Sequence, residues 1–116
     1  MSELQPVLEV IFFRSSADTE PVRDWLKSLS KEDRRTIGED TKTAQFGWPL
    51  GMPLVRKMEP NLWEVRSGTK DGIARVLFTV IGNKMVLLHG FVKKSQKTPK
   101  DELATARKRL KMLEDV

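Results

Sequence analysis

The sequence predicts an α+β fold in which helices pack on a small antiparallel sheet. Apolar side chains recur at helical spacing between residues 18 and 47, whereas from Pro53 to residue 92 they alternate with a period of two. A further capped helix pattern begins near residue 98. The predicted order is strand, two helices, antiparallel meander and closing helix, and the absence of any linker or repeat predicts one domain over residues 1–116.

The chain is expected to enter the fold through a strand and an amphipathic helix. Residues 7–14, VLEVIFFR, are rich in β-branched and aromatic side chains, which favours a strand. The helix that follows is expected to start at a cap supplied by Asp18 or Thr19, with Pro21 in its first turn. Its predicted buried stripe consists of Val22, Trp25, Leu26 and Leu29.

The second predicted helix has signals at both ends. Ser30 with Asp33 three residues later forms an Asp variant of the capping box, and Gly47 marks the stop. Ile37, Thr41 and Ala44 are the residues expected to face inward.

The alternating region predicts four short strands, at 53–58, 62–67, 73–81 and 84–92. Gly82-Asn83 suits a two-residue hairpin turn between the last two, because both residues tolerate positive φ. The closing helix is expected to use Thr98 as its cap, Pro99 at the first position and Asp101 at the third. Its inward residues are predicted to be Leu103, Ala106, Leu110 and Leu113.

The positive charge of the chain is concentrated near its C-terminus. Residues 1–88 hold 13 Lys and Arg against 12 Asp and Glu, whereas residues 89–116 hold 8 against 4. A localised basic stripe is typical of a polyanion partner, although many small proteins are basic for solubility alone. The chain has no cysteine and no apolar run near the roughly 20 residues that span a bilayer, so we expect a cytoplasmic protein without a membrane partner.

Alternation along the strands predicts which side chains share a face. Ala74, Val76, Phe78 and Val80 form an apolar face, so Arg75 points to the other side. In the last strand, one side carries His89, Phe91 and Lys93, and the other carries Leu88, Gly90 and Val92. If the polar faces of neighbouring strands coincide, one concave surface carries Glu64, Arg66, Arg75, His89 and Lys93.

Such a surface suits metal-free cleavage of RNA, in which the 2′-hydroxyl attacks the adjacent phosphate. The reaction needs an acid and a base, and cations that stabilise the charge on the phosphate. His89 is the obvious group that titrates near neutral pH, and Phe91 or Trp48 could stack on an unpaired base. The fixed positive charges are Arg66, Arg75, Lys93 and Lys94. Taken singly, each of these residues also fits a structural or solvated role, and neither a zinc set nor a calcium loop is present in the sequence.

Several of these motifs together resemble the RelE/ParE toxin superfamily, and more narrowly its phage-derived HigB-like branch. They are the strand Leu62-Trp63-Glu64-Val65-Arg66, the strand Arg75-Val76-Leu77-Phe78, the segment HGFVKKSQKTP at 89–99, and the acidic and alanine-rich helix start at 101–106. The match covers about residues 60–107 well and the start of the chain more loosely.

The resemblance implies a RelE-like fold and the toxin of a type II toxin-antitoxin pair, which cuts mRNA on the ribosome without a cofactor or metal. Its implied partners are the ribosome, mRNA and a HigA-like helix-turn-helix antitoxin, with which it would form a hetero-oligomer. The resemblance implies catalytic roles for Arg66, Arg75, Lys93, Lys94 and His89. The wider RNA-binding surface is expected to include Lys57, Phe91, Lys97, Arg107, Lys108 and Lys111.

Two departures leave other functions open. Some RelE-like nucleases use a tyrosine near the C-terminus, and this chain has none, so His89 would have to fill that acid or base role. Glu64 stands where some relatives place a lysine and could serve as a base or merely reduce the positive field. A ParE-like inhibitor of DNA gyrase and a non-catalytic phage-derived binding module are the alternatives.

Overall fold

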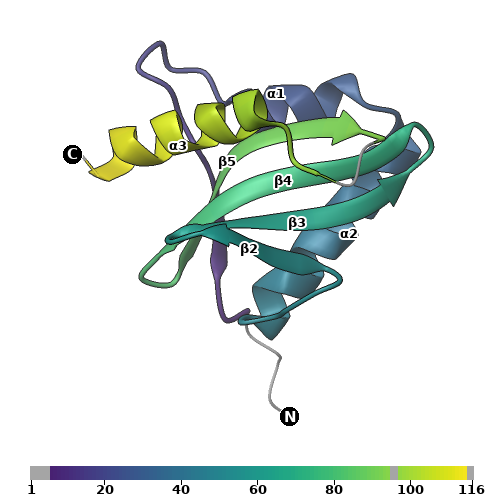
Figure 1. Ribbon diagram of the computed structural model, residues 1–116, viewed down its shortest axis with the longest axis horizontal. Helices are drawn as coiled ribbons and strands as arrows, with labels where there is room; N and C mark the ends of the chain where they lie inside the picture. The colour runs from purple at the N-terminus through teal and green to yellow at the C-terminus, as the bar shows by residue number, and fades with distance from the viewer. Residues whose placement is uncertain (1–5, 95–96, 115–116) are drawn as a thin grey trace.

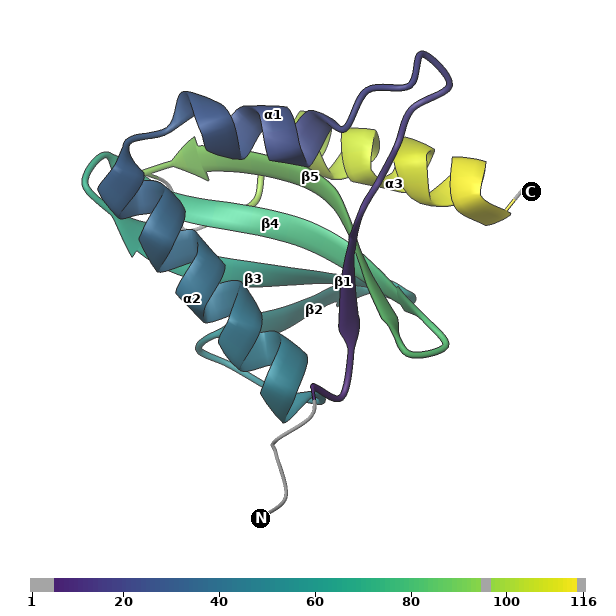
Figure 2. The same ribbon diagram turned by 180° about the vertical axis from the view of Figure 1, so that it is seen from behind.

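The computed structural model describes residues 6–94 and 97–114, and it confirms the α+β prediction. A five-stranded sheet in the order β1-β5-β4-β3-β2 is covered by α1 and α2 on one face and by α3 on the other (Figures 1 and 2). The helices are α1 (Pro21–Ser28), α2 (Lys31–Gly47) and α3 (Lys100–Glu114). The strands are β1 (Glu9–Phe12), β2 (Val55–Glu59), β3 (Leu62–Thr69), β4 (Gly72–Ile81) and β5 (Lys84–Lys93).

The sheet is mixed because β1 pairs with β5 in parallel, a pairing that the sequence does not indicate. The chain leaves β1, crosses one face of the sheet as α1 and α2, and re-enters at the opposite edge as β2 (Figure 2). The antiparallel meander from β2 to β5 then returns the chain to the side of β1. A parallel pair requires such a long connection, since a hairpin can join only antiparallel strands.

The face under α1 and α2 holds the larger core, as the alternation predicts. Ala74, Val76 and Phe78 are buried there, and Val80 packs against them. From the helices, Val22, Ile37 and Ala44 are buried in the same cluster, and Thr41 is also buried. Trp25 packs on β5 where Gly90 offers no side chain, and a Cβ at Gly90 would collide with the Trp25 ring.

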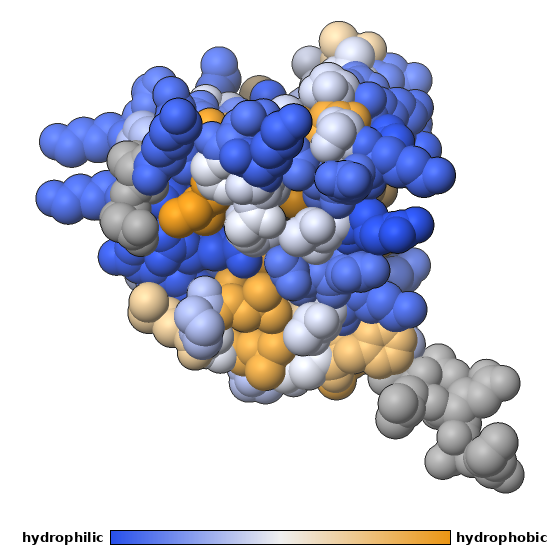
Figure 3. Space-filling model, turned by 90° about the vertical axis from the view of Figure 1, so that its right-hand side faces the viewer, coloured by the Kyte–Doolittle hydropathy of each residue, from blue (hydrophilic) through white to orange (hydrophobic). Residues whose placement is uncertain are grey.

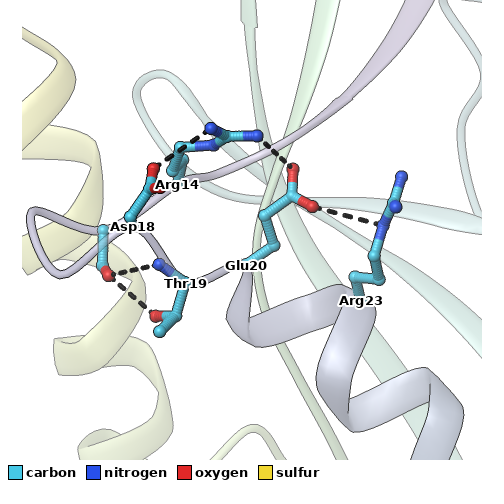
Figure 4. A network of polar contacts seen from close by, with 6 residues as sticks. Arg14, Asp18, Thr19, Glu20 and Arg23 are labelled. Carbon is cyan, nitrogen blue, oxygen red and sulfur yellow. Dashed lines mark hydrogen bonds and ion pairs between the residues drawn. The ribbon is translucent and has the colours of Figure 1, made fainter.

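The capping predictions are confirmed for α2 and wrong for α1. The Ser30 hydroxyl accepts a hydrogen bond from the Asp33 N–H at 3.2 Å, and α2 ends at Gly47. Glu20 is the N-cap residue of α1, and its side chain makes no cap bond. Asp18 is instead held by Arg14 at 3.1 Å within the preceding turn, and Thr19 bonds Ser15 (Figure 4).

The β4–β5 hairpin is confirmed, but a bulge changes the facing of one residue. Gly82 takes a φ of 61° in the two-residue turn. Leu77 pairs with His89 whereas Phe78 pairs with Leu87, so Leu88 is an extra residue in β5. The prediction that Leu88 faces away from Phe91 is therefore wrong, because an extra residue shifts the alternation and both side chains lie in the cluster under α3.

Helix α3 packs through the predicted residues and closes a second, smaller core. Ala106 is buried in that core, and Leu103, Leu110 and Leu113 pack against it together with β-strand residues such as Leu77. Thr98 does not cap the helix, because its hydroxyl bonds a side chain of β3. Among the described residues, no helix is long and apolar enough to cross a membrane.

The close approach at Gly90 gives a direct test of the packing of α1 on β5. We expect Gly90→Ala to lower the free energy of unfolding by about 1–3 kcal/mol, because the new methyl group must displace the Trp25 ring. Gly68→Ala in β3 is the matched control, since a Cβ there meets nothing within 4 Å. Urea denaturation of both variants checks this, and equal stability would contradict the described packing.

Candidate functional site

The face of the sheet under α3 carries a row of polar residues from four strands, which we call the polar face. In register, Arg56 of β2 lies opposite Glu64 of β3, and Arg66 of β3 lies opposite Arg75 of β4. On β5, His89 lies two residues before Phe91, and Phe91 pairs with Arg75. The predicted sharing of one face thus agrees with the observed registers for all five residues, Glu64, Arg66, Arg75, His89 and Lys93.

Glu64 lies at the centre of the polar face and is fully buried, with 0% of its surface exposed. Its Oε2 accepts a hydrogen bond from the Thr98 hydroxyl at 2.6 Å, and its Oε1 lies 3.6 Å from Nε of Arg66. Arg56, Arg66 and Arg75, which we call the arginine cluster, surround this single carboxylate and leave an excess of positive charge. Glu64 therefore acts as an internal counter-ion for the cluster.

Arg75 is as fully buried as Glu64. Its Nη1 donates to the carbonyl oxygen of Lys97 at 2.8 Å, and its guanidinium lies 6.0 Å from the centre of the Phe91 ring. Burial lowers the pKa of Arg75, the Glu64 carboxylate raises it, and the two other arginines of the cluster lower it further. Arginine keeps its proton at neutral pH, so the buried charge needs these partners.

His89 is held by α3 at both ring nitrogens. Its Nε2 lies 3.1 Å from Oε1 of Glu102, and its Nδ1 lies 3.3 Å from Nη1 of Arg109. A neutral ring protonated on Nε2 satisfies both contacts, since it donates to the carboxylate and accepts from the guanidinium. Burial lowers the pKa of Arg109, which also donates to the Leu88 carbonyl at 2.8 Å. Proton transfer by His89 would therefore require one of these contacts to open.

Three residues predicted to contact RNA are not placed to do so on the polar face. Phe91 is only 6% exposed and stacks on His89, so its ring has no open face for a base. Lys57 lies over the ring of Trp63, in the layer that packs against α2. Trp48 packs edge-on against Trp63 in that same layer, on the far side of the sheet from the arginine cluster.

Exposed lysines gather where β5 ends. Lys93 and Lys94 are exposed there, and Lys97 and Lys100 are exposed on the way into α3. Gly72, the first residue of β4, lies so close to this strand end that a Cβ would come within 2.9 Å of the Lys93 carbonyl oxygen. This end of the molecule is largely hydrophilic (Figure 3). Ser95 and Gln96 of the motif at 89–99 lie outside the described residues.

The predicted basic residues of α3, Arg107, Lys108 and Lys111, are all exposed. Arg107 donates to both carboxylate oxygens of Glu59 in β2, at 2.8 and 3.0 Å. Lys108 lines a cavity of about 350 Å³ with Phe13 and other residues from the start of the chain.

Four residues of the polar face were not predicted from the sequence as site residues. Arg56 faces Glu64 across β2 and β3, and the period of two in 53–58 was the signal for it. Glu102 and Arg109 are seven residues apart in α3, which puts them on one side of the helix beside His89. Thr98 carried only the signal of a helix cap, so its bond to Glu64 was not predictable from spacing.

Among residues 6–94 and 97–114, no three His, Cys, Asp or Glu side chains lie close enough together to hold a metal ion. What the polar face offers is fixed positive charge around a buried carboxylate, with an imidazole at its border. This arrangement can bind an anionic group at its exposed margin, where Arg66 keeps 15% of its side chain exposed.

The fold is a small α+β domain with a mixed five-stranded sheet, which is consistent with the RelE-like fold that the resemblance implies. Residues 24–111 match the family described as "Phage derived protein Gp49-like (DUF891)". The chain belongs to this phage-derived Gp49-like family, which is a RelE/ParE-like toxin family. A search of curated proteins gives no match.

The contacts of His89 predict that Glu102 stabilises the docking of α3. We expect Glu102→Ala to lower the free energy of unfolding by about 1 kcal/mol, because the variant loses the hydrogen bond to Nε2 of a largely buried ring. Glu114→Ala, at the exposed end of the same helix, is the control and should be neutral. Chemical denaturation at neutral pH measures both, and a neutral Glu102→Ala would argue against the described His89 contacts.

Proposed function

We propose that this chain is the HigB-like toxin of a type II toxin-antitoxin pair and that it cleaves mRNA on the ribosome without a metal. Membership of a RelE/ParE-like toxin family supports the toxin role. The observation that carries the nuclease role is the arginine cluster of the polar face, bordered by His89 and by the exposed lysines at the end of β5. A gyrase inhibitor would not need such a cluster on its sheet.

The arginines suit the electrostatic part of RNA cleavage. Attack of the 2′-hydroxyl on the phosphate forms a 2′,3′-cyclic phosphate and breaks the bond to the 5′-oxygen, which leaves with a proton from the acid. Negative charge builds on the phosphate oxygens during this step, and fixed cations lower the barrier by stabilising that charge. Arg66 is partly exposed, as is Arg56, and would contact the phosphate, while buried Arg75 adds positive potential from beneath. Lys93 and Lys94 would hold the flanking phosphates of the RNA strand.

Proton transfer is assigned to His89 in this proposal. In the described contacts its Nε2 faces Glu102, so the ring would take part once that bond opens to substrate. A positioned acid or base contributes about 10²- to 10⁴-fold in rate. The proposed partner that silences the toxin is a HigA-like helix-turn-helix protein encoded beside it.

Primer extension on a reporter mRNA after brief induction in bacterial cells tests the nuclease role. We expect new 5′ ends within the translated frame, and we expect Arg66→Ala to reduce them by about 100-fold or more, because one charge-stabilising donor is lost. Arg66 is a better target than Arg75, whose complete burial would make its loss a folding defect. Arg35→Ala, an exposed arginine on α2, is the matched control and should cleave like the wild type.

Two outcomes would contradict this proposal. Growth arrest with intact mRNA would favour a ParE-like gyrase inhibitor, which relaxation and supercoiling assays with purified gyrase would then examine. Neither arrest nor cleavage would favour a non-catalytic binding module.

A further inference from the structure

The stretch before α3 is bonded to the polar face at two successive residues. The Thr98 hydroxyl donates to Glu64 of β3 at 2.6 Å, and the carbonyl oxygen of Lys97 accepts from Arg75 of β4 at 2.8 Å. The two contacts join a segment near the C-terminus to side chains 34 and 22 residues earlier in the chain. Both contacts end on the fully buried charged residues of the face.

Thr98 makes this contact instead of the cap bond that the sequence predicts for it. A threonine just before a helix ordinarily bonds the free N–H groups of the first turn. Here α3 starts at Lys100, and the Leu103 N–H is bonded by the backbone carbonyl of Pro99. The hydroxyl is therefore directed at the carboxylate, where a short bond to a charged acceptor is about twice as strong as a neutral one.

The contact fixes the charges of the cluster relative to one another. Glu64 presents Oε2 to Thr98 and Oε1 to Arg66, so the hydroxyl helps to set the orientation of the carboxylate that faces Nε of Arg66. The same segment holds Arg75 through the adjacent carbonyl. Movement of residues 97 and 98 would shift both arginines, because each depends on that segment either directly or through Glu64.

We infer that Thr98 is a positioning residue that holds the arginine cluster in its working geometry through Glu64. The kinetic consequence of this inference rests on the proposed nuclease function. Its structural consequence rests on the described contacts alone. Thr98 touches no substrate in this account. Its loss should therefore impair the chemical step and leave ribosome binding, carried by exposed lysines, intact.

The kinetic test uses purified full-length variants and translating ribosomes. We expect Thr98→Val to lower kcat by about 10-fold or more while KM for ribosomes changes less than about twofold, since the fold and the exposed charges remain. Thr98→Ser, which keeps the hydroxyl, should restore kcat. Thr105→Val removes a hydroxyl that bonds only the Asp101 carbonyl within α3 and serves as the matched control.

The structural test is hydrogen exchange of the Arg75 guanidinium, followed by NMR on arginine-labelled protein. We expect exchange to be at least about tenfold faster in Thr98→Val than in the wild type, and to return to the slow rate in Thr98→Ser. Glu64→Gln, which keeps the side-chain shape but weakens the same bond, should change exchange in the same direction. It also keeps the test decisive where Thr98→Val does not fold.

The two readouts separate failure of the inference from failure of the proposed function. Wild-type kcat and wild-type exchange in Thr98→Val would overturn the inference even if the protein is a nuclease. If the wild type does not cleave mRNA, the proposed function fails and the exchange rates alone decide whether Thr98 holds Arg75. A loss of kcat that Thr98→Ser does not restore would also overturn it.

Discussion

The burial of Glu64 among three arginines is the interaction on which the polar face depends. A buried charge is costly unless it is paired and hydrogen-bonded, and both Glu64 and Arg75 are fully buried. The positive charges of the cluster would repel one another across neighbouring strands if the carboxylate were absent. These side chains come from paired strands and not from loops, so the strand registers fix their positions relative to one another.

This pairing also explains how the C-terminal part of the chain is attached. Helix α3 buries Ala106 over an apolar patch, but its position is further fixed by polar contacts at His89 and by the bonds at Thr98 and Lys97. The polar face is consequently covered over much of its area by its own chain, and access is left at its margin beside Arg66. A ligand that binds there would meet positive charge supported from below by buried residues.

Local patterns predicted most of the fold because the local signals and the tertiary packing agree. The Ser30 cap, the Gly82-Asn83 turn and the apolar side of β4 are each set by neighbouring residues in the chain. The parallel pairing of β1 and the bulge at Leu88 were not predictable, since both depend on how distant strands meet. Alternation therefore located Arg66 and Arg75 but misplaced Leu88, the bulged residue itself.

The candidate site was predictable only as far as the sheet supplies it. The shared face of Glu64, Arg75 and His89 follows from alternation. Their burial does not follow from alternation, because α3 and the stretch before it cover these residues when they dock on the sheet. The covering of the Phe91 ring by His89 and Arg75 was likewise not predictable from the strand pattern.

A double-mutant cycle between Glu64→Gln and Thr98→Val, measured as free energies of unfolding, tests the central role of the buried carboxylate most directly. We expect a coupling of about 1 kcal/mol, because the Thr98 hydroxyl bonds a charged acceptor in the wild type and a weaker neutral one in Glu64→Gln. Strictly additive effects, within about 0.3 kcal/mol, would mean that the two side chains do not act together and would contradict the account.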